Sequence, residues 1–80
     1  MLKVEAKTKH SPEEAIKRAV AFFTTGYGLK VTEQTSTSVC LEGGGGRITV
    51  TVCAEGKGAS VEVESQEWDR QAREFIKKLA

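Results

Sequence analysis

Five short segments in which apolar and polar residues alternate constrain the fold of this chain more than any other feature of its sequence. They span residues 2–7, 29–34, 38–42, 47–54 and 59–64. A period of two is typical of strands that bury one face, and turn-forming residues separate the last four segments. The sequence therefore predicts five strands, each with one apolar face.

The two hairpins predicted among the last three segments can be tested against each other, because a slip of one residue would turn every side chain to the opposite face. We place Glu42 opposite Arg47 across a flexible loop of four glycines, Gly43–Gly46. We treat Gly56-Lys57 as a two-residue turn of the Gly-X type. Both registers then bring the apolar residues to one common face, namely Val39, Leu41, Ile48, Val50, Val52, Val61 and Val63.

Two amphipathic helices are also predicted, one before and one after the last four strands. The first begins at Ser11-Pro12-Glu13-Glu14, where a serine N-cap, a proline in the first turn and a glutamate three residues after the cap form a capping box. We expect it to end near Thr25, ahead of two glycines. The second begins at Ser65 as its N-cap and carries an apolar stripe of Trp68, Ala72, Phe75, Ile76 and Leu79.

The exposed side of the second helix carries charges four residues apart. Asp69 and Arg73, Arg70 and Glu74, and Glu74 and Lys78 have the spacing of ion pairs along a helix. We expect these pairs to form.

Placing both helices on one face of an antiparallel sheet is the simplest way to bury both apolar stripes. A right-handed connection through the first helix then puts the first strand beside the fifth. The predicted fold class is α+β with the order β-α-β-β-β-β-α and a five-stranded sheet of strand order 1-5-4-3-2. Eighty residues form one core, so we treat residues 1–80 as a single domain.

Two segments carry a resemblance to known folds. They are Val4-Glu5-Ala6, which leads into Ser11-Pro12-Glu13-Glu14-Ala15, and the amphipathic closing helix from Trp68. With the order of elements, they resemble half of the TATA-box-binding-protein-like fold and are similar to a shortened START-like helix-grip domain. The START-like resemblance implies a ligand held between helices and sheet.

Charge and hydropathy exclude several classes of partner. Twelve Lys and Arg residues against eleven Asp and Glu residues give a net charge of +1, which offers no general attraction to nucleic acid or to an acidic membrane. The polar face of the predicted sheet carries four cations and four anions, so nucleic-acid binding is the least favoured alternative. The N-terminal residues lack the apolar segment of a signal peptide, and we expect a cytoplasmic location.

No constellation of residues predicts catalysis, a metal or a cofactor. The predicted register places Cys40 opposite Thr49 and Cys53 opposite Ser36, too far apart for a disulfide. Two thiols and the single histidine, His10, cannot supply the ligands of a zinc site. We therefore expect a protein that is not an enzyme and that binds no cofactor.

Two functions remain open. The first is an interaction module that forms a homodimer through a sheet edge, because Lys3, Glu5 and Lys7 alternate on the first strand and an antiparallel copy would set Lys against Glu. The alternative is a carrier or sensor of a small hydrophobic ligand, held between helices and sheet. Its predicted lining is Phe22, Tyr27, Leu41 and Trp68.

Overall fold

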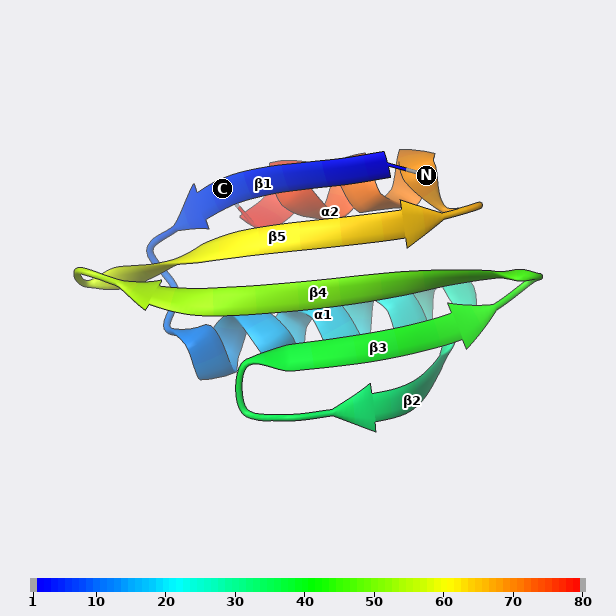
Figure 1. The fold of residues 1–80 in the computed structure, drawn as a ribbon, viewed down its shortest axis with the longest axis horizontal. Coiled ribbons are helices and arrows are strands. Elements are labelled where there is room, and N and C mark those ends of the chain that lie inside the picture. The colour runs from blue at the N-terminus through cyan, green and yellow to red at the C-terminus, as the bar shows by residue number, and fades with distance from the viewer. Residues whose placement is uncertain (1, 80) are drawn as a thin grey trace.

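The computed structural model describes residues 2–79, which form a five-stranded antiparallel sheet and two helices. The strand order is β1-β5-β4-β3-β2, and both helices cover the same face of the sheet (Figure 1). The predicted fold class, order of elements and strand order are therefore confirmed. The elements are β1 (Leu2–Thr8), α1 (Pro12–Tyr27), β2 (Lys30–Gln34), β3 (Ser38–Gly43), β4 (Gly46–Glu55), β5 (Gly58–Gln66) and α2 (Asp69–Leu79).

The registers of the two central hairpins are also as predicted. Glu42 pairs with Arg47 across the first hairpin, and Val52 pairs with Val61 across the second. The inward apolar residues of β3, β4 and β5 are buried beneath the helices, except Ala54 near the end of β4, which is exposed. The core consists mainly of small β-branched side chains from the sheet and a few large ones from the helices, including Val39, Leu41, Ile48, Val50, Val52, Val61 and Val63 with Ile16, Phe23, Phe75 and Leu79.

The four glycines form a tight turn rather than the flexible loop that was predicted. Gly43 and Gly46 pair with each other as strand residues, which leaves a two-residue connection. Gly44 has φ 57° and Gly45 has φ 82°, so both central residues lie in the left-handed region that favours glycine. Backbone twist at this turn matches the twist of the flanking strands.

Close packing is a second reason why glycine occupies two of these positions. A Cβ atom at Gly46 would overlap the carbonyl oxygen of Gln66, and one at Gly44 would lie 3.0 Å from Cζ2 of Trp68. The Trp68 indole N–H donates to the carbonyl oxygen of Gly43 at 2.9 Å. The turn is thus fitted against the connection between β5 and α2.

The N-cap of α1 is as predicted, but the helix ends later than predicted. Among residues 2–79 the return bond of the predicted capping box, from the Ser11 backbone N–H to the Glu14 carboxylate, does not form, and Oε1 of Glu14 lies 3.3 Å from Nε of Arg18. The Ser11 hydroxyl oxygen accepts a hydrogen bond from the backbone N–H of Glu14 at 3.2 Å, which confirms the N-cap. The helix continues past Thr25 to Tyr27, because the left-handed residue that ends it is Gly28, with φ 72°.

The predicted start of α2 at Ser65 is wrong. Ser65 is a buried residue of β5, where it continues the alternation of inward residues along that strand. Its hydroxyl accepts a hydrogen bond from the backbone N–H of Trp68 at 3.1 Å. Glu67 turns the chain with φ 72°, and the first helical hydrogen bond joins the Ala72 N–H to the Trp68 carbonyl. Three residues therefore intervene between Ser65 and the helix.

The regular alternation predicted for β2 is wrong as well. A bulge between Val31 and Glu33 shifts the register, so Glu33 rather than Thr32 lies opposite Cys40, and Gln34 lies opposite Val39. All five residues of β2 are exposed.

Among residues 2–79, no helix is long and apolar enough to span a membrane.

Candidate interaction surfaces

The β1 edge of the sheet is long and regular. All seven residues of β1 pair with β5 without a shift of register, and within residues 2–79 no strand lies on the other side of β1. Lys3, Glu5 and Lys7 are exposed, whereas Leu2, Val4 and Ala6 are half-buried above α2. The three predicted interface residues therefore lie in one row on the polar face of an edge strand, whose outward backbone groups are free to pair.

Ion pairs within the chain neutralise two of these three residues. The Nζ of Lys3 lies 3.5 Å from Oε1 of Glu62, and the Nζ of Lys7 lies 3.0 Å from Oε1 of Glu55. Glu5 pairs in register with Glu62, a residue of the same charge, and no cation of residues 2–79 lies within ion-pair distance of it. Glu5 is thus placed to receive a cation from outside the chain.

The β2 edge is a poorer template for pairing. It has five residues, its register shifts at the bulge, and the Thr32 hydroxyl donates to the Cys40 carbonyl at 3.3 Å. Bulges twist an edge away from a flat partner strand and are one way in which proteins protect sheet edges.

All five aromatic residues of the chain gather in one cluster between α1 and α2. The ring centroids of Trp68 and Tyr27 are 6.0 Å apart, those of Tyr27 and Phe22 are 5.5 Å apart, and those of Phe22 and Phe75 are 5.5 Å apart. Phe23 contacts both Phe22 and Phe75. This cluster, which we call the aromatic seam, joins the two helices.

Three of the four predicted ligand-binding residues, Phe22, Tyr27 and Trp68, belong to the aromatic seam. Two open grooves run along it, with volumes of about 230 and 490 Å³, and Phe22 and Lys78 line both. Tyr27 lies at the rim of the larger groove with 37% of its surface exposed. Leu41 is fully buried in β3, and neither Leu41 nor Trp68 lines either groove.

The two cysteines lie apart on the polar face of the sheet. Cys40 pairs with Thr49 as predicted, but Cys53 pairs with Ser60 of β5 and not with Ser36, because β3 begins only at Ser38. Both thiols are free. Within residues 2–79, no three side chains of His, Cys, Asp or Glu come together as a metal site would require.

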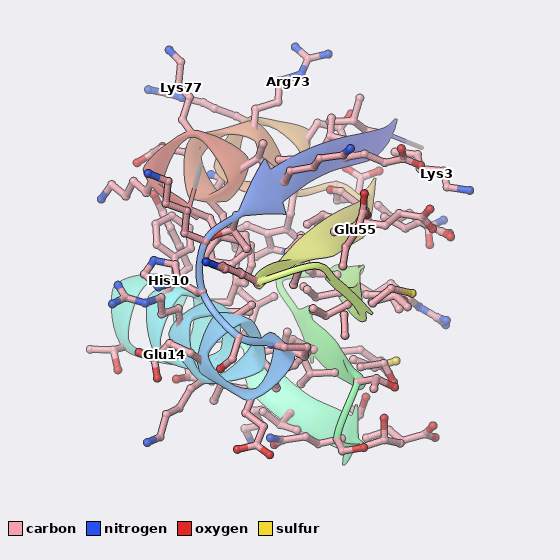
Figure 2. All side chains as sticks on the ribbon, turned by 90° about the vertical axis from the view of Figure 1, so that its left-hand side faces the viewer. Lys3, His10, Glu14, Glu55, Arg73 and Lys77 are labelled. Carbon is pink, nitrogen blue, oxygen red and sulfur yellow. The ribbon has the colours of Figure 1, made fainter. Side chains whose placement is uncertain are left out.

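A basic face on α2 was not among the predicted sites. Arg70, Arg73 and Lys77 are all exposed, and the spacing i, i+3, i+7 places them along one side of the helix. Figure 2 shows Arg73 and Lys77 directed away from the rest of the domain. The ion pairs predicted along α2 do not form: among residues 2–79, no α2 cation lies within 4.0 Å of a carboxylate. The recurrence of cations at i, i+3 and i+7 was the signal in the sequence that could have predicted this basic face.

Comparisons with known proteins identify a shared fold. No protein-family model matches the chain, and no curated protein is similar to it in sequence. The solution structure of the Aha1 dimer from Colwellia psychrerythraea matches with a TM-score of 0.62 at 12% identity, over 99% of this chain and 96% of that one. At this identity the match shows the fold alone, and it supports the resemblance to helix-grip domains at that level.

Proposed function

We propose that this chain is a non-enzymatic interaction module that forms a homodimer through β1. The observation that carries the proposal is the contrast between the edges, because β1 is regular over seven residues and β2 is bulged. The matching structure is that of a dimer, and it supports the proposal through the shared fold. We expect the module to act in the cytoplasm, where thiols such as Cys40 and Cys53 stay reduced.

Charge favours a dimer register centred on Val4 over one centred on Glu5. A two-fold axis through Val4 sets Lys3 of each copy opposite Glu5 of the other, while Leu2 and Ala6 meet on the helix side. An axis through Glu5 would set the two Glu5 residues against each other and Lys3 against Lys7. Like charges directly opposite destabilise a strand pair, so we propose the register centred on Val4.

The variant Glu5→Lys tests this interface. It replaces both Lys-Glu contacts of the dimer by Lys-Lys contacts, and we expect the dimer dissociation constant to rise about tenfold. Within one copy the same change removes the apposition of Glu5 and Glu62, so the fold is expected to be retained. Native mass spectrometry and light scattering across a dilution series measure the dissociation constant, and a thermal melt checks the fold.

Two further variants separate the interface from general charge effects. Glu33→Lys makes the same change of charge on β2 and is expected to leave dimerisation unchanged. The double variant Lys3→Glu/Glu5→Lys reverses both charges and is expected to recover much of the affinity. Two results would contradict the proposal. One is a wild-type chain that stays monomeric at about 100 μM, because standard interfaces associate well below that concentration. The other is an equal loss of dimer affinity in Glu5→Lys and Glu33→Lys.

A carrier or sensor of a small hydrophobic ligand is the second candidate. The observation that favours it is the pair of grooves along the aromatic seam, where Phe22 lines both and Tyr27 borders one. The same mass spectra test it, because a monomer with a retained small molecule would show added mass. A dimer without added mass supports the interaction module instead.

A further inference from the structure

The charges of this chain are divided unevenly over its surface. Residues 2–9 and 69–79, which comprise β1, the adjoining Lys9 and α2, contain seven cations and three anions and are four positive overall. The rest of the chain contains five cations and eight anions and is three negative overall. β1 and α2 lie side by side at one edge of the domain (Figures 1 and 2). A net charge of +1 therefore conceals a basic edge on an otherwise acidic domain.

Within this basic edge, ion pairing leaves most of the unpaired positive charge on α2. Lys3 and Lys7 of β1 are paired with glutamates of β4 and β5. Arg70, Arg73 and Lys77 are exposed and have no carboxylate of residues 2–79 within 4.0 Å. From Arg70 to Lys77 the helix rises about 10 Å, at 1.5 Å per residue. We call these three residues the basic face of α2.

We propose that the basic face of α2 binds an acidic segment of a partner protein, one with several Asp or Glu side chains in succession. Two of its three cations are arginines, whose planar guanidinium groups bind carboxylates through two parallel hydrogen bonds. The apolar side of α2 is buried against the sheet through Ala72, Phe75 and Leu79, so the basic face is the side of this helix that remains for a partner.

Three features favour an acidic peptide over nucleic acid. The face is short, and an extended polyanion would continue onto the acidic remainder of the domain. At physiological ionic strength a charge is screened beyond about 8 Å. The acidic remainder of the domain therefore repels only a ligand that is long enough to reach it. All five aromatic rings lie in the aromatic seam, where they pack against one another rather than offering a platform for stacked bases.

The probe for this proposal is a fluorescently labelled hexaglutamate peptide, whose binding is followed by anisotropy at low salt. The double variant Arg73→Gln/Lys77→Gln is expected to bind it about tenfold more weakly than the wild type, since two exposed charge contacts are lost. The matched control Lys17→Gln/Lys30→Gln removes two exposed cations elsewhere, on α1 and β2, and changes net charge equally. We expect the control to bind within about twofold of the wild type.

Two results would overturn the proposal. Equal weakening by the two double variants would show that net charge alone attracts the peptide. Tighter binding of a hexathymidylate of similar charge than of hexaglutamate would assign the face to nucleic acid. This inference does not depend on dimerisation through β1, and Glu5→Lys, which tests the dimer, is expected to retain peptide binding.

Discussion

The two edges of the sheet are built differently, although each is a single strand beside a helix. β1 pairs at all seven of its positions and places half-buried side chains above α2. β2 pairs at four positions around a bulge, and all five of its residues are exposed. β1 is therefore part of the core, whereas β2 is attached to it mainly through backbone pairing with β3. A strand that is firmly held and still unpaired on one side is the better site for a second copy.

A buried hydrogen bond ties β1 to α2. The Thr8 hydroxyl at the end of β1 donates to the carbonyl oxygen of Leu79 in the last turn of α2, at 3.0 Å. The same hydroxyl oxygen accepts from the backbone N–H of His10, which lies in the connection between β1 and α1. For β2, the corresponding side-chain bond from Thr32 is exposed. The contrast between edges can thus be tested with matched substitutions.

The largest effect is expected from loosening the helix beneath β1. Phe75 is 2% exposed and packs against Phe22 and Phe23, so Phe75→Ala should lower the free energy of unfolding by about 3–5 kcal/mol. Urea denaturation measures the change. Phe22→Ala, which truncates a half-buried ring of the same cluster, is the comparison and should cost less. A nearly neutral Phe75→Ala would show that α2 does not anchor this edge.

A smaller effect is expected from the hydrogen bond that ties β1 to α2. Thr8→Val keeps the side-chain shape but leaves the buried Leu79 carbonyl without its donor, and should lower the free energy of unfolding by about 1–2 kcal/mol. Thr32→Val makes the same change at the exposed bond of β2 and should cost less than about 0.5 kcal/mol. Equal costs, measured by thermal unfolding, would remove the distinction between the edges.

The smallest effect is expected on β2 itself. Val31 is 38% exposed, so Val31→Ala should lower the free energy of unfolding by about 0.5 kcal/mol. Val4→Ala on β1 removes a half-buried side chain and should cost more. Urea denaturation measures the loss of unfolding free energy in each variant. A larger loss for Val31→Ala than for Val4→Ala would contradict the claim that β1 is held more firmly than β2.

The periodic alternation of apolar and polar residues was sufficient to predict the fold, but it did not predict the irregular parts of the fold. The hairpin registers followed from alternation alone, because each segment had one apolar face to bury. The bulge in β2 has no glycine to mark it, and both neighbours of the shift are ordinary strand residues. Glu67 adopts a left-handed φ that sequence patterns rarely predict for a residue other than glycine, and this moved the start of α2.

The candidate interaction surfaces could also be predicted only in part from the sequence. The row of Lys3, Glu5 and Lys7 could be read from alternation, and the structure places it at a sheet edge. The basic face of α2 has a helical spacing, but its importance depends on which cations are paired. That pairing is set by contacts between distant strands, such as Lys7 with Glu55, and is not contained in local sequence.

Amide hydrogen exchange, followed by NMR at a dilute and a concentrated sample, tests most directly whether β1 is the edge that self-associates. Exchange slows where an amide gains a hydrogen-bond partner, and the two edges report separately in one spectrum. We predict that the outward amides of β1 exchange more slowly at the higher concentration, while those of β2 are unchanged. Slowing confined to β2, or no dependence on concentration at either edge, would contradict the account.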